Sequence, residues 1–196
     1  MAAVDELLSE LSDEGKSALL LMREMSDYYR RLLTKLELDS LTGLPGSNKY
    51  HELIAELTAH PAESVGFIVF DVNDLKRYND TMGHHAGDLL LQRAAESFHA
   101  VTGDGVHIFR TGGDEFAAVL PNCTESGMAD VVAKWQVALD GLNASGGGPI
   151  RCTIAHGTAF GKGEYALAEV MKFADERMYS DKRKMKENGL KIGEVR

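Results

Sequence analysis

The pattern of apolar and polar positions divides the chain into a helical N-terminal segment and a longer remainder. Over residues 16–36, apolar residues recur at alternating spacings of three and four, which is typical of a packed helix seam. One stripe contains Ala18, Leu21, Met25, Tyr28 and Leu32, and its neighbour contains Leu19, Met22, Tyr29, Leu33 and Leu36. Residues 12–15 predict a break before this helix. The pattern favours a stalk that dimerises, with packing on the chain's own body as the alternative.

The remainder alternates between extended and helical patterns. Residues 65–70 form a continuous apolar run, rich in β-branched and aromatic side chains, that is typical of a buried central strand. Apolar runs on both sides of Gly112 and Gly113 predict a hairpin, because glycine accepts the positive φ of a tight turn. The periodicity also predicts a strand over 150–158 and helices over 48–58, 88–101, 126–142 and 165–186.

Composition places the chain among globular proteins. Its 196 residues suit one domain plus an appendage, and 44% are hydrophobic and 26% charged. No apolar run reaches the roughly 18 residues of a membrane span, and the N-terminus is acidic rather than signal-like. Cys123 and Cys152 lack metal-site spacing, so we expect free thiols in the cytoplasm. The net charge of −9 argues against general nucleic-acid binding.

Acidic side chains are placed where a cation could bind. Asp71 ends the predicted central strand, and Asp114 and Glu115 lie on the predicted hairpin. If the hairpin pairs beside that strand, three carboxylates converge, and they would raise one another's pKa unless a cation neutralised them. Hard oxygen ligands favour Mg²⁺ or Mn²⁺ accompanying the phosphates of a nucleotide. The alternative is a solvated acidic turn.

Other polar residues suit the remaining parts of a nucleotide. Lys76, on the turn after Asp71, could meet phosphates, and the basic cluster 182–186 is either an anion site or a solvated helix face. Asn79 and Asp88 offer an amide and a carboxylate complementary to the edge of guanine. Alone, each of these two is equally well explained as a helix cap.

Over residues 39–187 the chain resembles the GGDEF diguanylate cyclase family. The motifs that carry the resemblance are DSLTGL (39–44), FDVNDLK (70–76), NDTMGHHAGD (79–88), RTGGDEF (110–116), TIAHG (153–157) and ADERMY (174–179). The resemblance implies an α/β (α+β) fold, with a mostly antiparallel five-stranded sheet wrapped by helices, related to nucleotidyl cyclases and polymerase palms. It implies condensation of two GTP molecules into cyclic di-GMP with release of two pyrophosphates. Domains are expected at 1–38 (stalk), 39–190 (catalytic) and 191–196 (tail).

The resemblance implies a role for each matching position. Asp71, Asp114, Glu115 and the carbonyl of Val72 would bind Mg²⁺ or Mn²⁺, and Glu115 or Asp114 would deprotonate the attacking 3′-hydroxyl. Asn79, Asp88 and His84 would recognise guanine. The phosphate-binding set would be Asn73, Asp74, Leu75, Lys76, Lys182 and Lys186. Because each domain binds one GTP, the resemblance implies a homodimer through the N-terminal helix, and a regulatory partner on that helix is a further expectation.

Several positions depart from the family pattern. Gly103 and Val106 stand where the family carries the Arg and Asp of its feedback site, so we expect no inhibitory site there. Lys186 replaces a common Arg, and His156 replaces a small or apolar residue and is interpreted as a core histidine. The competing hypothesis is an inactive GGDEF module that binds GTP, cyclic di-GMP or a protein. No sensor domain is recognised in the first 38 residues.

Overall fold

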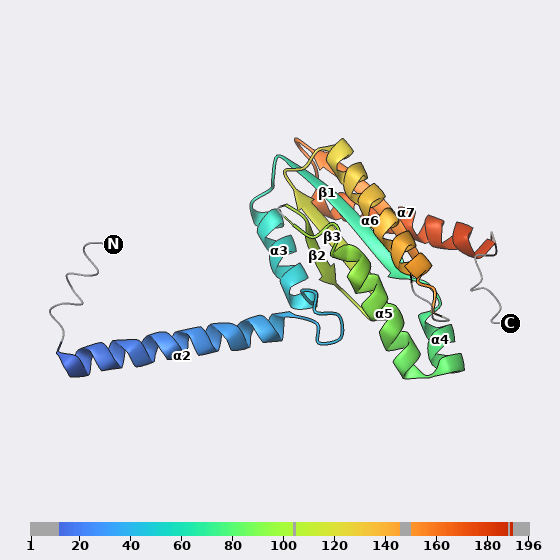
Figure 1. Cartoon of the computed structure of the whole chain (residues 1–196). Helices are drawn as coiled ribbons and strands as arrows, with labels where there is room; N and C mark the ends of the chain where they lie inside the picture. Colours follow the sequence, from blue (N-terminus) through green and yellow to red (C-terminus); the bar gives the residue numbers. More distant parts are fainter. Residues whose placement is uncertain (1–11, 104, 146–149, 188, 190–196) are drawn as a thin grey trace. The chain divides into compact units, whose positions relative to one another are not determined.

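A computed structural model describes residues 12–103, 105–145, 150–187 and 189, in two compact units, Met1–Leu38 and Asp39–Arg196. The first unit contains helix α2 (Asp13–Glu37) (Figure 1). Ser12 caps this helix, because its hydroxyl oxygen accepts the Gly15 N–H at 3.2 Å, and the predicted break is therefore a helix start. Among the described side chains, both predicted stripes present exposed apolar groups, at Leu19, Leu21, Met22, Met25, Tyr28 and Tyr29.

The second unit is built on an antiparallel sheet with the strand order β2-β3-β1-β4. Its strands are β1 (Ser64–Val72), β2 (His107–Arg110), β3 (Glu115–Pro121) and β4 (Ile154–Lys162). The predicted hairpin is confirmed as β2–β3, and it pairs beside the central strand with Asp71 opposite Glu115. The predicted fold class is confirmed, although the described residues form four strands where five were expected.

Helices cover both faces of this sheet. They are α3 (Ser47–Ala59), α4 (Leu75–Met82), α5 (His84–Phe98), α6 (Glu125–Ser145) and α7 (Leu167–Glu187). Helices α5 and α6 lie on one side of the sheet and α7 on the other (Figure 1). Because side chains alternate along β1, Phe70 packs with residues of α5 and α6, while Phe67 packs with residues of α3 and α7. Trp135 is fully buried on the first face, where its indole N–H donates to the Ser97 hydroxyl at 3.0 Å. None of the helices in the described ranges is long and apolar enough to span a membrane.

Helix α7 lies unusually close to β4, and glycine makes this possible. A Cβ placed on Gly157 would be 2.1 Å from the Ala174 carbonyl oxygen and from the Met178 nitrogen. No side chain could fit at that distance, so the glycine sets how closely the last helix approaches the sheet. The C-terminal part of α7 is thereby brought to the end of β1.

The predicted strand over 150–158 is wrong in its first four residues, since β4 begins at Ile154. Side chains, rather than a neighbouring strand, satisfy the backbone of 150–152. Asn143 accepts the Cys152 N–H at 2.9 Å and donates to its carbonyl at 2.7 Å. Tyr78 forms the equivalent pair with Arg151, and Arg93 donates to the carbonyl of Ile150. These contacts replace strand pairing and hold the segment against α4, α5 and α6.

Three local predictions are corrected. Lys76 lies in helix α4, not on a turn, because residues 75–82 form a short helix entered through Asp74 at φ 64°. Asp88 is not an N-cap, since α5 begins four residues earlier, after Gly83 at φ 83°. Gly112 and Gly113 do not adopt the positive φ expected of the hairpin turn, which spans the four residues 111–114 and is stabilised by Arg110.

Candidate functional site

A cavity of about 740 Å³ opens where β1 ends, between α4 and the last turns of α7. Its lining residues are Val72, Asn73, Asp74, Leu75, Lys76, Arg77, Asp80, Thr81, Asp114, Thr153, Lys182, Met185 and Lys186. Four of these side chains are basic and three are acidic. All six residues of the predicted phosphate-binding set line this cavity, together with Val72 and Asp114 from the predicted metal set.

Asp71 lies beside the cavity and is only 5% exposed. The ammonium nitrogen of Lys182 lies 2.6 Å from its Oδ1 and 2.7 Å from its Oδ2, and only the contact with Oδ2 has hydrogen-bond geometry. Burial raises the pKa of Asp71, Lys182 lowers it and nearby Asp114 raises it again, with a net upward shift. A buried carboxylate with an incompletely satisfied oxygen is a suitable ligand for a hard cation.

The second predicted metal ligand, Asp114, is placed by the backbone. Its carbonyl oxygen accepts the Val72 N–H at 2.9 Å, which fastens the hairpin turn to the end of β1 and leaves the Asp114 side chain at the cavity wall. Two carboxylates and nearby carbonyl oxygens fit Mg²⁺ or Mn²⁺ in the kind of donor they supply.

The third predicted carboxylate, that of Glu115, does not line the cavity that Asp114 lines. Glu115 pairs with Asp71 across the sheet, but its carboxylate lies near Gly112, where an added Cβ would be 3.1 Å from Oε2. It lines a second cavity of about 360 Å³, with Tyr50 and Met171. In the part of the chain that the structure describes, no group of three or more His, Cys, Asp or Glu side chains could hold a metal. The expected convergence of three carboxylates is thus reduced to two, and the metal role of Glu115 stays a prediction.

The backbone at the entrance to α4 forms the other wall. The Asn73 N–H donates to the Thr153 carbonyl at 2.9 Å, so this amide is already engaged and is not available to a phosphate. The Asn73 side-chain amide donates to the sulfur of Met185 on α7 at 3.3 Å. Amides of the first turn of α4 follow directly, and a helix N-terminus favours an anion.

The predicted guanine set lies outside the cavity lining. Asn79 packs on α5, where a Cβ on Gly87 would be 2.0 Å from its Oδ1, so Gly87 makes room for it. Asp88 and His84 are exposed on the first turns of α5. The structure therefore places Asn79 beside Gly87, the residue that precedes Asp88. The role of the predicted guanine set in base recognition stays a prediction.

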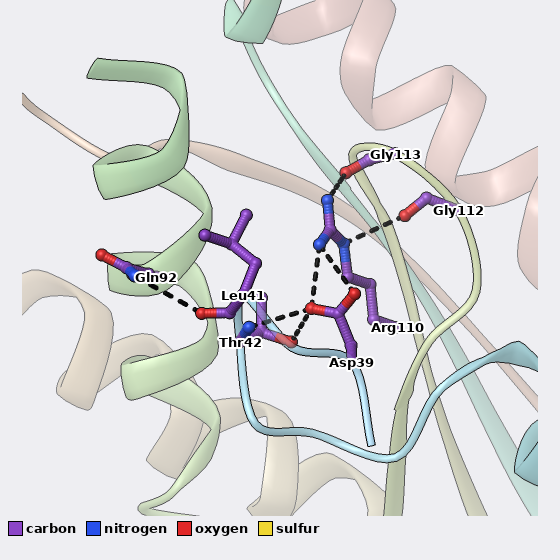
Figure 2. Close-up of polar contacts among 7 residues, drawn as sticks. All are labelled: Asp39, Leu41, Thr42, Gln92, Arg110, Gly112 and Gly113. Atoms are coloured by element: carbon purple, nitrogen blue, oxygen red, sulfur yellow. Dashed lines mark hydrogen bonds and ion pairs between the residues drawn. The ribbon is translucent and has the colours of Figure 1, made fainter. Parts of the chain in front are cut away.

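Arg110 supports the site by holding the hairpin turn, a role that the sequence predictions did not include. Its guanidinium donates to Asp39 Oδ1 and Oδ2 at 2.9 and 3.0 Å, and to the carbonyls of Gly112 and Gly113 at 3.2 and 2.7 Å (Figure 2). Burial raises the pKa of Asp39, but hydrogen bonds from Thr42 and Arg110 outweigh it, so the pKa lies below its ordinary value. The sequence signal for this pair is the opposite charge of the first residues of two motifs, Asp39 in DSLTGL and Arg110 in RTGGDEF.

His156 fits the core-histidine interpretation only in part. Its ring centroid lies 5.2 Å from that of Trp135, but the residue is half-buried and its Nδ1 has no hydrogen-bond partner among the described residues. Burial lowers the pKa of His156, and Asp181 raises it, with a net downward shift. The same Asp181 accepts the His156 backbone N–H at 3.0 Å. His156 therefore also fixes α7 one residue before Lys182.

The family model for the GGDEF domain, described as diguanylate cyclase, matches residues 36–188. This chain belongs to the GGDEF family. The chain is 25% identical over 184 residues to diguanylate cyclase DosC of Escherichia coli K12, covering 91% of this chain and 40% of DosC. The chain thus spans less than half the length of that relative.

Solved structures of GGDEF proteins share the fold. The coiled coil and GGDEF domain of DgcB from Caulobacter crescentus, in complex with c-di-GMP, matches with a TM-score of 0.73 at 21% identity, covering 86% of this chain and 92% of that one. Diguanylate cyclase SiaD of Pseudomonas aeruginosa, in complex with its activator SiaC, matches with a TM-score of 0.67 at 25% identity, covering 94% of this chain and 76% of SiaD.

Proposed function

We propose that the chain is a diguanylate cyclase that condenses two GTP molecules into cyclic di-GMP in bacterial second-messenger signalling. The observation that carries the proposal is the cavity at the end of β1, where Asp114 and neighbouring Asp71 meet Lys76, Lys182 and Lys186 in a GGDEF domain. Carboxylates beside ammonium groups suit a triphosphate with its divalent cation.

In the proposed reaction, the 3′-hydroxyl oxygen of each GTP attacks the α-phosphorus of the other. A new P–O bond forms, the bond between the α-phosphorus and the bridging oxygen breaks, and pyrophosphate leaves. Glu115 or Asp114 accepts the hydroxyl proton. Lys76, Lys182 and Lys186 hold the phosphates, and Asn79, Asp88 and His84 recognise guanine.

Mg²⁺ or Mn²⁺ would be held by Asp71, Asp114 and the Val72 carbonyl. When bound, it would neutralise charge on the transferred phosphoryl group and lower the pKa of the attacking hydroxyl. The buried, incompletely satisfied carboxylate of Asp71 supports this assignment.

Two nucleotides must face each other, so the proposal includes a homodimer through α2. Exposed apolar side chains along this helix, such as Leu21 and Met25, support it. DgcB is a coiled-coil relative, and SiaD is bound to an activator, so a regulatory partner on α2 is also proposed. We place the protein in the cytoplasm, in keeping with its free cysteines, Cys123 and Cys152.

Incubation with GTP and Mg²⁺, followed by chromatography, tests the activity. We expect cyclic di-GMP from the wild type and no detectable product from Asp114→Ala, whose circular dichroism should be unchanged. Asp130→Ala, an exposed position on α6, is the matched control and should retain full turnover. GTP binding without any product would instead support the binding-module hypothesis.

Sedimentation of the full chain tests the dimer. Leu21→Glu combined with Met25→Glu should shift the protein towards monomer and reduce the activity in parallel. A wild type that stays monomeric at all concentrations and still makes product would refute the role of α2.

A further inference from the structure

The ammonium group of Lys182 lies beside both oxygens of the Asp71 carboxylate. The ammonium nitrogen lies within 2.7 Å of both carboxylate oxygens, and these residues are 111 positions apart in the sequence. Asp71 is almost fully buried, and burial of a carboxylate is unfavourable without a cation beside it. In the ligand-free chain, Lys182 is therefore the counter-ion of Asp71.

Contacts on either side hold this lysine in place. One residue before it, Asp181 accepts the His156 backbone N–H at 3.0 Å. Three residues after it, Met185 accepts the Asn73 side-chain amide at 3.3 Å. The C-terminal turns of α7 are thus tied to β4 and to the end of β1, so movement of the Lys182 ammonium requires only a rotation of its own side chain.

The proposed cyclase reaction needs both residues for other partners. Asp71 is to bind a divalent cation, and Lys182 is to bind phosphate, yet in this structure the two residues form an ion pair with each other. An ammonium nitrogen within 2.7 Å of both oxygens repels a divalent ion that approaches the same carboxylate, although Oδ1 still has acceptor capacity. Lys182 on Asp71 therefore weakens metal binding, and Lys182 on phosphate relieves that repulsion.

We propose that Lys182 is an internal counter-ion that keeps divalent cations off Asp71 until the phosphates of a nucleotide draw its ammonium away. The inference rests on the proposed function for the identity of the nucleotide. In the free protein the divalent cation competes with a tethered ammonium and binds weakly. Phosphates that engage Lys182 free the carboxylate, so metal and nucleotide bind cooperatively.

Lys186 provides a matched control within the same cavity. It lies one turn further along α7, and its positive charge lowers the pKa of Asp71, so it is electrostatically close. However, the ion pair with Asp71 is formed by Lys182. Removal of either lysine deletes one positive charge from the cavity, but only removal of Lys182 frees the carboxylate oxygens.

The experiment is a titration of the nucleotide-free full chain with Mn²⁺, with free Mn²⁺ measured by electron paramagnetic resonance. We expect Lys182→Met and Lys182→Gln to bind Mn²⁺ at least about tenfold more tightly than the wild type, because the competing charge is gone. Lys186→Met should stay within about threefold of the wild type. The inference is overturned if the two Lys182 variants bind Mn²⁺ no more tightly than Lys186→Met.

Thermal unfolding provides a second measurement. Lys182→Met leaves Asp71 buried without a counter-ion, so its Tm should fall in metal-free buffer and recover more steeply with Mn²⁺ than that of the wild type. Lys182→Gln can still donate a hydrogen bond and is the variant to use if Lys182→Met does not fold. Equal Mn²⁺-induced Tm shifts in the wild type and Lys182→Gln would contradict the proposal.

The two proposals fail separately. If the wild type makes cyclic di-GMP but the Lys182 variants gain no affinity for Mn²⁺, the counter-ion role is refuted and the cyclase stands. If no product forms but the Lys182 variants gain affinity for Mn²⁺, the counter-ion role stands and the cyclase is refuted.

Discussion

The ion pair between Asp39 and Arg110 offers a quantitative test of how the hairpin turn is held. Arg110 makes four hydrogen bonds, two to Asp39 and one each to Gly112 and Gly113 (Figure 2). The exposed fractions of the Arg110 and Asp39 side chains are 13% and 25%. The pair is thus partly shielded from water and should contribute more than a surface ion pair.

Asp39→Asn removes the charge from this contact while keeping the size of the side chain. The amide oxygen can still accept from the Thr42 N–H and hydroxyl, as Oδ1 does now at 2.9 and 2.6 Å. The charge and one acceptor for Arg110 are lost together, because the NH₂ group that replaces Oδ2 cannot accept the hydrogen bond that Arg110 now donates at 3.0 Å. We expect the free energy of unfolding to fall by about 1–2 kcal/mol at pH 7. Asp39→Ala also removes the turn contacts with Thr42 and should cost about 1 kcal/mol more.

Urea unfolding followed by circular dichroism measures these differences. The control is Glu52→Gln, which removes the carboxylate of an exposed pair with Lys49 and should change the free energy of unfolding by no more than about 0.5 kcal/mol. Equal effects of Asp39→Asn and Glu52→Gln would refute the reasoning that shielding strengthens the pair.

The stability that the Asp39 charge contributes should depend on pH with a definite sign. The pKa of Asp39 is lowered in the folded chain, so its contribution is present above the unfolded value and is lost as the pH falls through the folded value. The stability gap between wild type and Asp39→Asn should be equal at pH 7 and pH 5 and should narrow below pH 3.8, the ordinary value. A gap that stays constant down to pH 3 would show that the Asp39 charge is not responsible.

Two further predictions concern the framework around the site. Gly157→Ala should prevent soluble folding, because the new Cβ would lie 2.1 Å from backbone atoms of α7, and the yield of soluble protein measures this. Gly141→Ala on α6, with open space around it, should raise the free energy of unfolding by about 0.5–1 kcal/mol, as measured by thermal unfolding. Ser97→Ala leaves the buried Trp135 indole N–H without its acceptor and should cost about 1–3 kcal/mol in urea unfolding, and a loss below about 0.5 kcal/mol would show that the hydrogen bond contributes little.

Strong periodicity made the main elements predictable. The apolar run 65–70 lies within β1, and the helix predicted over 48–58 is observed as Ser47–Ala59. These segments are defined by their own sequence, since one apolar stripe or run must face the core. Short elements were harder to predict from the sequence. Helix α4 was missed because eight mostly polar residues carry little periodicity, and tertiary contacts of Tyr78 with Arg151 hold it in place.

Within the candidate site, residue types were predictable and their pairing was not. The family resemblance predicts the phosphate-binding set, and all six of its residues line one cavity. The engagement of Lys182 with Asp71 depends on how α7 crosses the sheet, which is set by the clearance at Gly157. The direction of Glu115 depends on the hairpin turn that Arg110 holds. Both are properties of packing between distant segments, and local pattern does not encode them.

The charges around the cavity explain why the divalent cation and the nucleotide should arrive together. Lys76, Arg77, Lys182 and Lys186 are balanced by Asp74, Asp80 and Asp114 at the lining and by Asp71 beside it. A triphosphate alone would place its negative charge against Asp71 and Asp114, and a divalent cation alone would meet the ammonium of Lys182. A nucleotide already carrying its cation presents phosphate to the lysines and metal to the carboxylates in one step. If the proposed function holds, this balance of charges would therefore favour the metal–nucleotide complex over either component.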